Sequence, residues 1–386
     1  MCHANESSQK MKNRLGLIAI GLSICLGSCS TASAINKFDI ADAVLRDFPR
    51  AMPSPILTKP LLEKIAFGSC LPDANSGGVF DIIRRQAPDL FLMVGDNVYG
   101  DYTPNDPQMS GMRASYWQLS QNQAFSRLVG AVTTFATWDD HDYGDNDAGG
   151  GYPNKSLSER MFETFWNVDV NDQRRQHDGI YTAFTHGESG RRVQIIILDT
   201  RFFRDALLPT DVPMAKGRER YLPHSLQSSA TMLGEAQWNW LEQQLKEPAQ
   251  LRLIVSSVQL VADGHGWEAW STMPAQRQKF YDLIKSTNAG GVLVLSGDRH
   301  HASINRYLGN PYPIYDFTSS PLGGVPSNGS GENAPLRIYH SNANEINFGE
   351  VNIDWQNRQV SLVTKGKEGE VLHSHTVSFN EIGVSQ

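Results

Sequence analysis

Polar side chains that could hold metal ions stand where four predicted strands end, in the segments FGSC, VGDNVYGD, TWDDHDYGDND and LSGDRHHAS. Each segment opens with residues typical of a buried strand. Binding sites of α/β proteins form at the carboxyl ends of strands, so we expect the four clusters to meet. The candidate ligands are Cys70, Asp96, Asn97, Tyr99, Asp101, Asp139, Asp140, His141, Asp142, Asp145, Asn146, Asp147, Asp298, His300 and His301.

The mixture of ligand types indicates two kinds of cation. Many carboxylates in one pocket repel one another, and bound cations remove that cost. Thiolate, phenolate, a shared carboxylate and imidazole suit a trivalent ion such as Fe(III), whereas the remaining aspartates suit Ca²⁺, Mg²⁺ or Mn²⁺. Two cations that share a carboxylate lie about 3.5 to 4 Å apart, and together they activate a water and clamp a phosphoryl group.

Each cluster taken alone has a structural explanation as well. Gly-Asp after a strand is common in turns, and DRHH alone is more often a surface turn. The acidic run DDHDYGDND could be a calcium loop, although no Glu stands at the twelfth position that an EF-hand requires. The motifs G-x-S-x-G, G-x-x-x-x-G-K-[ST] and His-Glu-x-x-His are absent. A cysteine nucleophile with His141 or His300 would leave the aspartates unexplained.

Several blocks resemble a known family. GDNVY, DDHD and GDRH look like the metal-binding blocks of the calcineurin-like metallophosphoesterases, in the variant of the alkaline phosphatase D (PhoD-like) family. The segments DTRFFRD, TMLGEAQWNWLEQQL, YDFTSSPLGG and NFGEVNIDW are similar to that family too, and the resemblance covers residues 62–378. The superfamily has D-x-H at its first block, whereas Cys70 stands there in this chain, as it does in that family. The GDxxY block also looks like that of the purple acid phosphatases, in which the tyrosine ligates ferric iron.

The resemblance implies roles for individual residues. The iron ligands would be Cys70, Asp96, Tyr99 and His300, with Asp96 bridging to a second metal. The second metal would face Asp140, Asn146 and Asp298. Its ligands are rich in oxygen, which favours Ca²⁺ over Mg²⁺, Mn²⁺ or Zn²⁺.

The resemblance also implies catalytic and substrate contacts. His141 would contact the phosphate and protonate the leaving oxygen, beside Asp140. Further candidates for substrate contacts are Arg201, Arg299 and His301. The superfamily's V-x-x-H block is VSSVQ here, without its histidine, and His265 is a candidate substitute.

Strands and helices alternate between residue 64 and about residue 312. Buried strands are predicted at 64–70, 88–96, 133–138, 193–201, 251–260 and 290–298, and helices at 77–87, 115–132, 157–167, 233–246 and 274–285. Residues 312–320, 348–355, 358–366 and 370–379 predict an antiparallel meander. Long loops are expected at 203–229 and 321–335. This order favours one α/β domain, and the resemblance implies a four-layer, metallophosphatase-like sandwich of two mixed β-sheets flanked by helices.

The N-terminal sequence predicts export. Residues 1–34 resemble a signal peptide, with basic Lys12 and Arg14 before an apolar run. It offers either a lipobox, Leu26–Cys29, or a cleavage site after Ala34. We expect a periplasmic or membrane-anchored lipoprotein, or a secreted protein. Residues 35–61 are predicted as a lead-in linker, 62–378 as the phosphoesterase domain and 379–386 as a tail. No later segment reaches the roughly 18 apolar residues of a membrane span.

Cysteine content and net charge limit the possible disulfides and partners of the protein. Once the signal is processed, Cys70 is the only thiol of the globular part, so no intramolecular disulfide can form there. The formal net charge is −7 without a long basic stripe, which disfavours nucleic acid as a partner.

We therefore predict an exported metal-dependent phosphoesterase that hydrolyses phosphomonoesters, phosphodiesters or both, by in-line attack of a metal-bound hydroxide at an Fe/Ca-type site. Its partner would be a small phosphate ester, with membrane contact only through a lipid anchor at Cys29. One alternative is a phosphodiesterase of phospholipase type at the same site. Another is a non-catalytic calcium-binding surface lipoprotein. A third is a non-haem iron oxidoreductase, which the crowd of carboxylates disfavours.

Overall fold

The computed structural model describes residues 44–72, 78–101, 106–324, 326–327, 332, 334–341 and 345–384. The predicted signal peptide and the first part of the predicted lead-in lie outside these residues. No helix of the described chain is long and apolar enough to cross a membrane.

Two mixed β-sheets form the centre of the molecule. The first has the strand order β15-β14-β13-β1-β2-β3 and the second β12-β10-β11-β9-β8-β5-β4. The strands of the first sheet are β1 (Lys64–Gly68), β2 (Leu90–Val94), β3 (Thr133–Thr137), β13 (Asn347–Asp354), β14 (Gln359–Gly366) and β15 (Val371–Ser378). Those of the second are β4 (Thr182–His186), β5 (Val193–Ile197), β8 (Leu251–Val255), β9 (Val292–Ser296), β10 (Ser303–Tyr307), β11 (Ile314–Thr318) and β12 (Arg337–His340).

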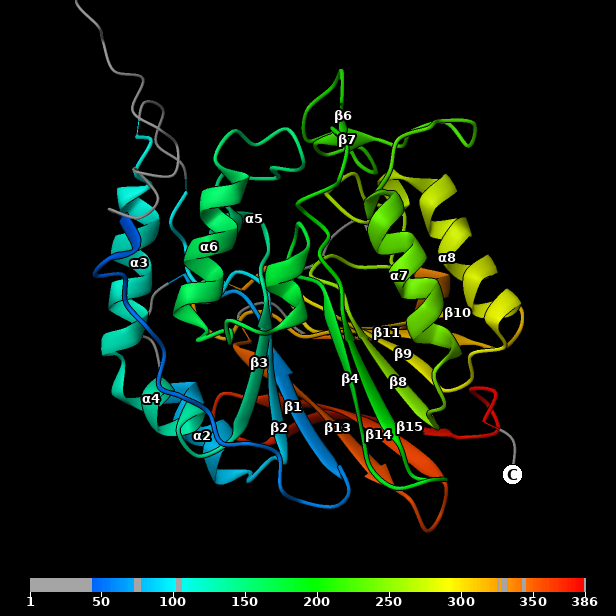
Figure 1. Ribbon diagram of the computed structural model, residues 1–386. Helices are drawn as coiled ribbons and strands as arrows, with labels where there is room; N and C mark the ends of the chain where they lie inside the picture. The colour runs from blue at the N-terminus through cyan, green and yellow to red at the C-terminus, as the bar shows by residue number, and fades with distance from the viewer. Residues whose placement is uncertain are drawn as a thin grey trace, which may run out of the picture.

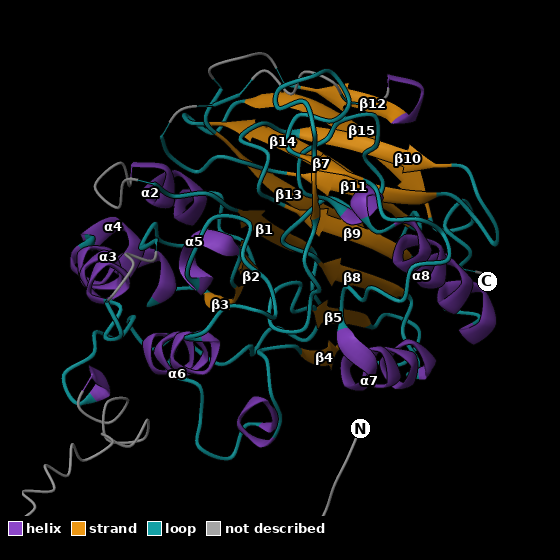
Figure 2. Cartoon of the chain, turned by 90° about the horizontal axis from the view of Figure 1, so that it is seen from above, coloured by secondary structure: helices purple, strands orange, loops and turns teal. Residues whose placement is uncertain are grey.

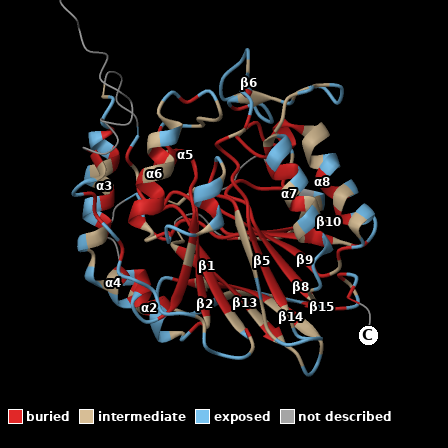
Figure 3. Cartoon of the chain, viewed as in Figure 1, coloured by how far each residue is buried: buried red, intermediate tan, exposed pale blue. Residues whose placement is uncertain are grey.

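Helices cover the outer faces of both sheets, so the predicted four-layer sandwich is confirmed (Figures 1 and 2). One helical layer consists of α2 (Gly78–Arg85), α3 (Ser110–Gln121), α4 (Gln123–Val129), α5 (Asp140–Tyr143) and α6 (Lys155–Phe165). The other consists of α7 (Gly234–Lys246) and α8 (Pro274–Thr287). Residues buried in the sheets and under the helices form two hydrophobic clusters, seen in Figure 3 as the red interior.

Parallel pairing brings the carboxyl ends of the central strands together. β2 pairs in parallel with both β1 and β3, and β9 pairs in parallel with β8 and β11 in the other sheet. Every residue of β2 is buried, as expected for a parallel strand covered on both faces. The turns that follow β1, β2, β3 and β9 are therefore anchored on rigid strands.

The predicted meander is only partly correct. β13, β14 and β15 pair antiparallel as predicted. The prediction is wrong for residues 312–320, because β11 joins the second sheet in parallel with β9. All five residues of β11 are buried, which is the pattern of a parallel strand between layers and not of a half-exposed meander strand.

The helix predicted over residues 115–132 is interrupted. It forms two helices, α3 and α4, which meet at Asn122. The Asn122 side chain accepts a hydrogen bond from the backbone N–H of Phe125 at 2.9 Å and so caps α4. Asparagine is among the preferred N-cap residues, so the break has a local cause.

Segments at both ends of the described chain contribute to the core. Phe48 and Ala51, in the predicted lead-in, are buried in the cluster on the first sheet. Phe379 and Ile382, in the predicted tail, are buried in the other cluster. Parts of the predicted lead-in and of the predicted tail therefore pack against the domain.

The raised pKa of Glu159, on α6, predicts a pH-dependent change in stability when this residue is substituted. Burial raises the pKa of Glu159 from 4.5 to about 8, and the charges of Glu163 and Asp199 add to the shift. The protonated, neutral carboxyl of Glu159 stabilises the folded state at pH values below its ordinary pKa. This stabilisation is lost as the pH rises through the pKa of the folded state. Glu159→Gln should therefore raise the Tm by about 2–4 °C at pH 8 and change it little near pH 4.5.

Differential scanning calorimetry at the two pH values measures this difference. Glu242→Gln, which changes an exposed glutamate of α7 paired with Lys246, is the matched control and should show no pH-dependent gain. An equal Tm shift of Glu159→Gln at both pH values would contradict the assignment.

Candidate metal centre and active site

Residues in the left-handed backbone region concentrate at the strand ends. Cys70, Asp96, Asp147, Asp298 and His300 all have φ between 50° and 62°. Non-glycine residues adopt this conformation rarely, and clusters of them occur at sites where the surrounding structure holds a functional geometry. Three of the four strand ends, those of β1, β2 and β9, place such residues directly after the strand.

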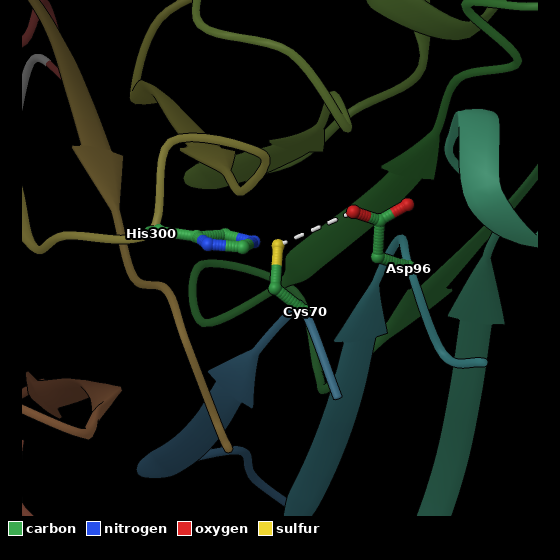
Figure 4. A group of neighbouring side chains, drawn as sticks. All are labelled: Cys70, Asp96 and His300. Carbon is green, nitrogen blue, oxygen red and sulfur yellow. Dashed lines mark hydrogen bonds between the residues drawn. The ribbon is translucent and has the colours of Figure 1, made fainter. Parts of the chain in front are cut away.

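The first ligand group brings together β1, β2 and β9. Cys70, Asp96 and His300 each offer a ligand atom, and these atoms lie within 4.8 Å of one another (Figure 4). The Cys70 Sγ lies 3.5 Å from Asp96 Oδ2. The Tyr99 hydroxyl lies 3.0 Å from the same oxygen and 2.9 Å from His300 Nε2. All four predicted iron ligands therefore converge.

The second ligand group shares Asp96 with the first. Asp96, Asp140 and His141 offer ligand atoms within 4.8 Å of one another. The backbone N–H of His141 donates to Asp96 Oδ1 at 3.2 Å, whereas Cys70 and Tyr99 contact Oδ2. The two oxygens of Asp96 thus face different groups, which is the geometry that a bridging carboxylate requires.

A third group of carboxylates lies beside the second. Asp140, Asp147 and Glu268 form it, and sequence reasoning did not select Glu268. Asp140 Oδ2 accepts a hydrogen bond from the Asp147 backbone N–H at 2.8 Å, while its buried Oδ1 has no hydrogen-bond partner. An orphaned buried carboxylate oxygen fits a cation ligand.

Each of the three groups contributes at least one residue to the lining of a pocket of about 300 Å³. It is lined by Asp140, His141, Asn146, Asp147, Arg220, Trp267, Glu268, Asp298, Arg299, His300 and Ser327. Predicted residues Asn146, Asp298 and Arg299 are thus placed at the site, although Asp298 belongs to none of the three ligand groups.

Burial, together with charge repulsion within the pocket, shifts several pKa values. Burial and the negative charge of Asp140 raise the pKa of Asp96 well above its ordinary value. Burial also raises the pKa of Asp298 to about 8, against the opposing effect of Arg299. Burial and the charge of Asp96 raise the pKa of the Cys70 thiol. A cation among these groups would neutralise the charges, so the donor set fits bound metal.

His141 is held in a defined orientation. Its ring stacks on that of Tyr99 with centroids 4.1 Å apart, and its Nδ1 lies 2.5 Å from Asp101 Oδ1. Burial alone would lower the pKa of His141, but the hydrogen bond to Asp101 and nearby carboxylates outweigh it and raise the pKa to about 10. With Nδ1 bonded to Asp101, Nε2 is the nitrogen that is left to act on another group.

Arg201 is not a pocket residue, which corrects the prediction of a phosphate contact. Its side chain is fully buried. The guanidinium binds Asp139, with Nε 2.6 Å from Oδ1, and lies 2.7 Å from Glu268. Arg201 therefore fixes carboxylates from behind the pocket, because all its charge is already engaged there.

His301 and His265 are also placed away from the pocket lining. The His301 side chain is fully buried and lies 2.8 Å from Glu332. His265 is 5% exposed and belongs to none of the catalytic ligand groups. The prediction of a substrate contact by His301 is therefore corrected. The predicted ligand role of His265 is corrected as well, because the residue of its loop that reaches the carboxylate group is Glu268.

The pocket also contains residues that sequence patterns did not single out. Arg220 comes from the long loop that carries the short strands β6 (Leu208–Pro209) and β7 (Tyr221–Leu222). It lies 2.6 Å from Asp147 and over the ring of Trp267. Arg220 and Trp267 both stand on connections outside the two large sheets, where no periodic signal marks them.

Ligand groups that share a carboxylate at the strand ends of a four-layer sandwich define a metallophosphatase-like protein. Comparison with known families agrees: residues 65–371 match the PhoD-like phosphatase family. The chain belongs to this family.

Individual relatives are more distant. The chain is 23% identical over 313 residues to alkaline phosphatase D of Bacillus subtilis (strain 168), a match that covers 72% of this chain and 51% of that protein. It therefore spans about half the length of that curated relative.

Two solved structures share the fold. A structure of PhoD superposes with a TM-score of 0.63 at 18% identity, over 86% of this chain and 70% of the other. GAP50, described as the anchor in the inner membrane complex of Plasmodium, superposes with a TM-score of 0.51 at 13% identity, over 82% of this chain and 89% of the other. Likenesses at this identity establish the fold, and activity has to be argued from the site.

Proposed function

We propose that the protein is a metal-dependent phosphoesterase that hydrolyses small phosphomonoesters, phosphodiesters or both. The observation that carries the proposal is Asp96, whose two oxygens face two different ligand groups. The family match and the name of the matched relative, alkaline phosphatase D, support it. Bound cations would acidify a water and neutralise charge on the phosphoryl oxygens.

Fe(III) is our proposal for the first group. Cys70, Asp96 and Tyr99 can supply three negative charges, and His300 adds a neutral nitrogen. Thiolate and phenolate favour iron over Ca²⁺ or Mg²⁺. Around Asp140, the second and third groups offer carboxylate oxygens of Asp96, Asp147 and Glu268 beside the His141 ring. This mostly oxygen donor set favours Ca²⁺, with Mg²⁺, Mn²⁺ and Zn²⁺ as less suitable ions.

Cys70→Ser tests the iron assignment. Serine preserves the size of the buried side chain but not the soft thiolate, so we expect a folded protein that has lost most of its iron. Iron is measured by elemental analysis, together with the visible charge-transfer band expected from Tyr99 phenolate on ferric iron. A colourless, iron-free wild-type preparation with full activity would rule out this assignment.

The chain supplies a proton donor and an anion-binding edge around the reacting phosphate. His141, held by Asp101 and Tyr99, would protonate the leaving oxygen. Arg299 lies over the ring of Trp267, and its buried Nε has no hydrogen-bond partner. The Arg299 side chain lines the pocket, and its guanidinium would bind a phosphoryl oxygen there, since guanidinium and phosphate form charge-assisted pairs.

Arg299→Ala tests this contact. We expect kcat/KM to fall by about 10- to 100-fold, which corresponds to the loss of a charge-assisted hydrogen bond. Arg277→Ala is the matched control, because Arg277 pairs with Asp263 outside the pocket lining and should leave kcat/KM unchanged within about twofold. Equal effects of the two substitutions would contradict a substrate contact by Arg299.

A pair of chromogenic substrates tests the proposed function. Purified protein with its metals should release p-nitrophenol from p-nitrophenyl phosphate, from bis(p-nitrophenyl) phosphate, or from both, and the ratio of turnovers separates monoesterase from diesterase activity. If a metal-loaded protein turns over neither, the non-catalytic calcium-binding alternative replaces the proposal.

Export is proposed on the sequence of residues 1–34. We infer a lipid anchor at Cys29, which would place the protein at a membrane surface facing an exported substrate. Detergent partitioning that is lost in Cys29→Ala supports the anchor, whereas a mature N-terminus at Ile35 refutes it.

A further inference from the structure

Two histidines and a glutamate form a separate buried cluster behind the pocket. His301 follows the β9 turn, Glu332 lies in the segment between β11 and β12, and His340 ends β12. Their ligand atoms lie within 4.8 Å of one another, and the side chains of His301 and Glu332 are fully buried. The cluster shares no residue with the three groups of the catalytic pocket.

Backbone contacts orient both imidazole rings. His301 Nδ1 lies 2.9 Å from the carbonyl oxygen of Arg299, and His340 Nδ1 lies 2.5 Å from that of Ser341. A ring nitrogen that faces a carbonyl oxygen carries a proton, so each ring, in its neutral form, presents a lone pair at Nε2. Histidines that bind metals usually donate their other ring N–H in this way.

The atoms that face the interior of the cluster lack hydrogen-bond partners. Nε2 of His301, Nε2 of His340 and Oε2 of Glu332 are all buried and unpaired by hydrogen-bond geometry. His301 Nε2 lies 2.8 Å from Glu332 Oε1, yet the contact is not aligned as a hydrogen bond. Buried polar atoms without partners are rare, and one cation between them would satisfy all three residues.

His265 lies in the same region but does not complete the ligand set. Its Nδ1 accepts a hydrogen bond from the backbone N–H of Trp267 at 3.3 Å. Its proton therefore sits on Nε2, which leaves no lone pair for a metal. The described ligands are thus two imidazole nitrogens and one carboxylate.

We propose that His301, His340 and Glu332 bind a divalent transition-metal ion, of which Zn²⁺ suits the ligands best. Two nitrogens and one carboxylate oxygen with an open fourth position match the ligand sets of zinc sites. The two rings are stacked, with centroids 4.4 Å apart and an interplanar angle of 23°, so binding one ion requires the rings to turn until both Nε2 atoms point at it.

Such an ion would brace the catalytic pocket. His301 directly follows Arg299 and His300, which both line the pocket. The Ser327 backbone N–H donates to the His300 carbonyl at 2.6 Å, and the Ser327 hydroxyl donates to that of Arg299 at 2.7 Å. An ion that joins His301 to Glu332 and His340 would connect three segments around this turn, so these three residues act as positioning residues.

Metal counting tests the site without reference to activity. Full-length protein is dialysed against trace Zn²⁺ with excess Ca²⁺, and zinc and iron are measured per chain. Glu332→Gln and His340→Gln should each bind one zinc equivalent fewer than the wild type while they keep its iron. His375→Gln is the matched control, because His375 also has an unpaired Nε2 but lies outside the cluster.

Cobalt provides a second readout. Co²⁺ at this site should give the strong visible d–d absorption of a low-coordinate ion in the wild type and in His375→Gln, and not in the two cluster variants. Equal zinc content in all four proteins, or a wild type that binds no zinc, would overturn the proposal and leave a His301–Glu332 ion pair. If Glu332→Gln does not fold, the zinc content of His340→Gln decides whether the cluster binds zinc, because His340 is the half-buried residue of the three.

Discussion

Asp96→Asn is expected to reduce phosphate ester hydrolysis by at least about 10³-fold, because a shared cation ligand contributes several kcal/mol. One Asp96 oxygen contacts Cys70 and Tyr99 and the other contacts the backbone of His141, so no other described residue can replace it between the two groups. Asparagine tolerates the left-handed backbone of this position, where φ is 50°. The substitution therefore removes charge while it preserves the local fold.

Turnover and metal content must change together in this variant. We expect Asp96→Asn to lose metal as well as activity and to keep the circular dichroism spectrum of the wild type. Asp263→Asn, at an exposed carboxylate paired with Arg277, is the control and should retain activity within about twofold. A folded Asp96→Asn protein with wild-type turnover would refute the shared-ligand assignment.

His141→Gln is expected to affect substrates in proportion to the basicity of their leaving groups. An alkyl phosphate needs a proton on its leaving oxygen, so its kcat should fall by about 10²- to 10⁴-fold. p-Nitrophenolate leaves readily without a proton, and its kcat should fall far less. The prediction rests on geometry, since Asp101 holds Nδ1 and directs Nε2 away from itself.

The comparison of two substrates separates proton donation from metal binding. A loss of equal size for the alkyl and the p-nitrophenyl ester, accompanied by loss of metal, would show that His141 acts as a ligand and not as the general acid. Asp101→Asn provides a further check, because it should weaken the alkyl reaction through the orientation and charge of His141 without removing a metal ligand.

The centre of the site could be predicted because its residues follow strands. Cys70, Asp96 and His300 come within a few residues of β1, β2 and β9, and strand ends converge in this class of fold. Asp140 and His141 follow β3 in the same way. The distance of these residues from strand ends along the chain was therefore enough to predict the ligands.

Residues contributed by long loops escaped prediction for a physical reason. Glu268 and Arg220 reach the pocket from loops whose paths depend on tertiary contacts, such as the pairing of Glu268 with buried Arg204. Arg201 shows the opposite error, since an arginine after a strand became a buried partner of Asp139. A single sequence does not reveal which charges will be neutralised inside the protein.

The same limit applied to the fold. Periodicity identified most strands and helices, yet it did not distinguish β11, a fully buried parallel strand, from a strand of the C-terminal meander. It also missed β4, whose half-buried residues pair at the edge of the second sheet beside β5. Pairing partners depend on contacts between distant segments, which local patterns do not encode.

The most direct test of the account measures phosphate release from p-nitrophenyl phosphate and from its bis ester by purified protein, before and after metal removal. We predict that activity disappears when a chelator removes iron and the second cation, and that it returns when Fe(III) and Ca²⁺ are restored together. Activity that persists in metal-free protein, or a fully metal-loaded protein that hydrolyses neither ester, would contradict the central claim.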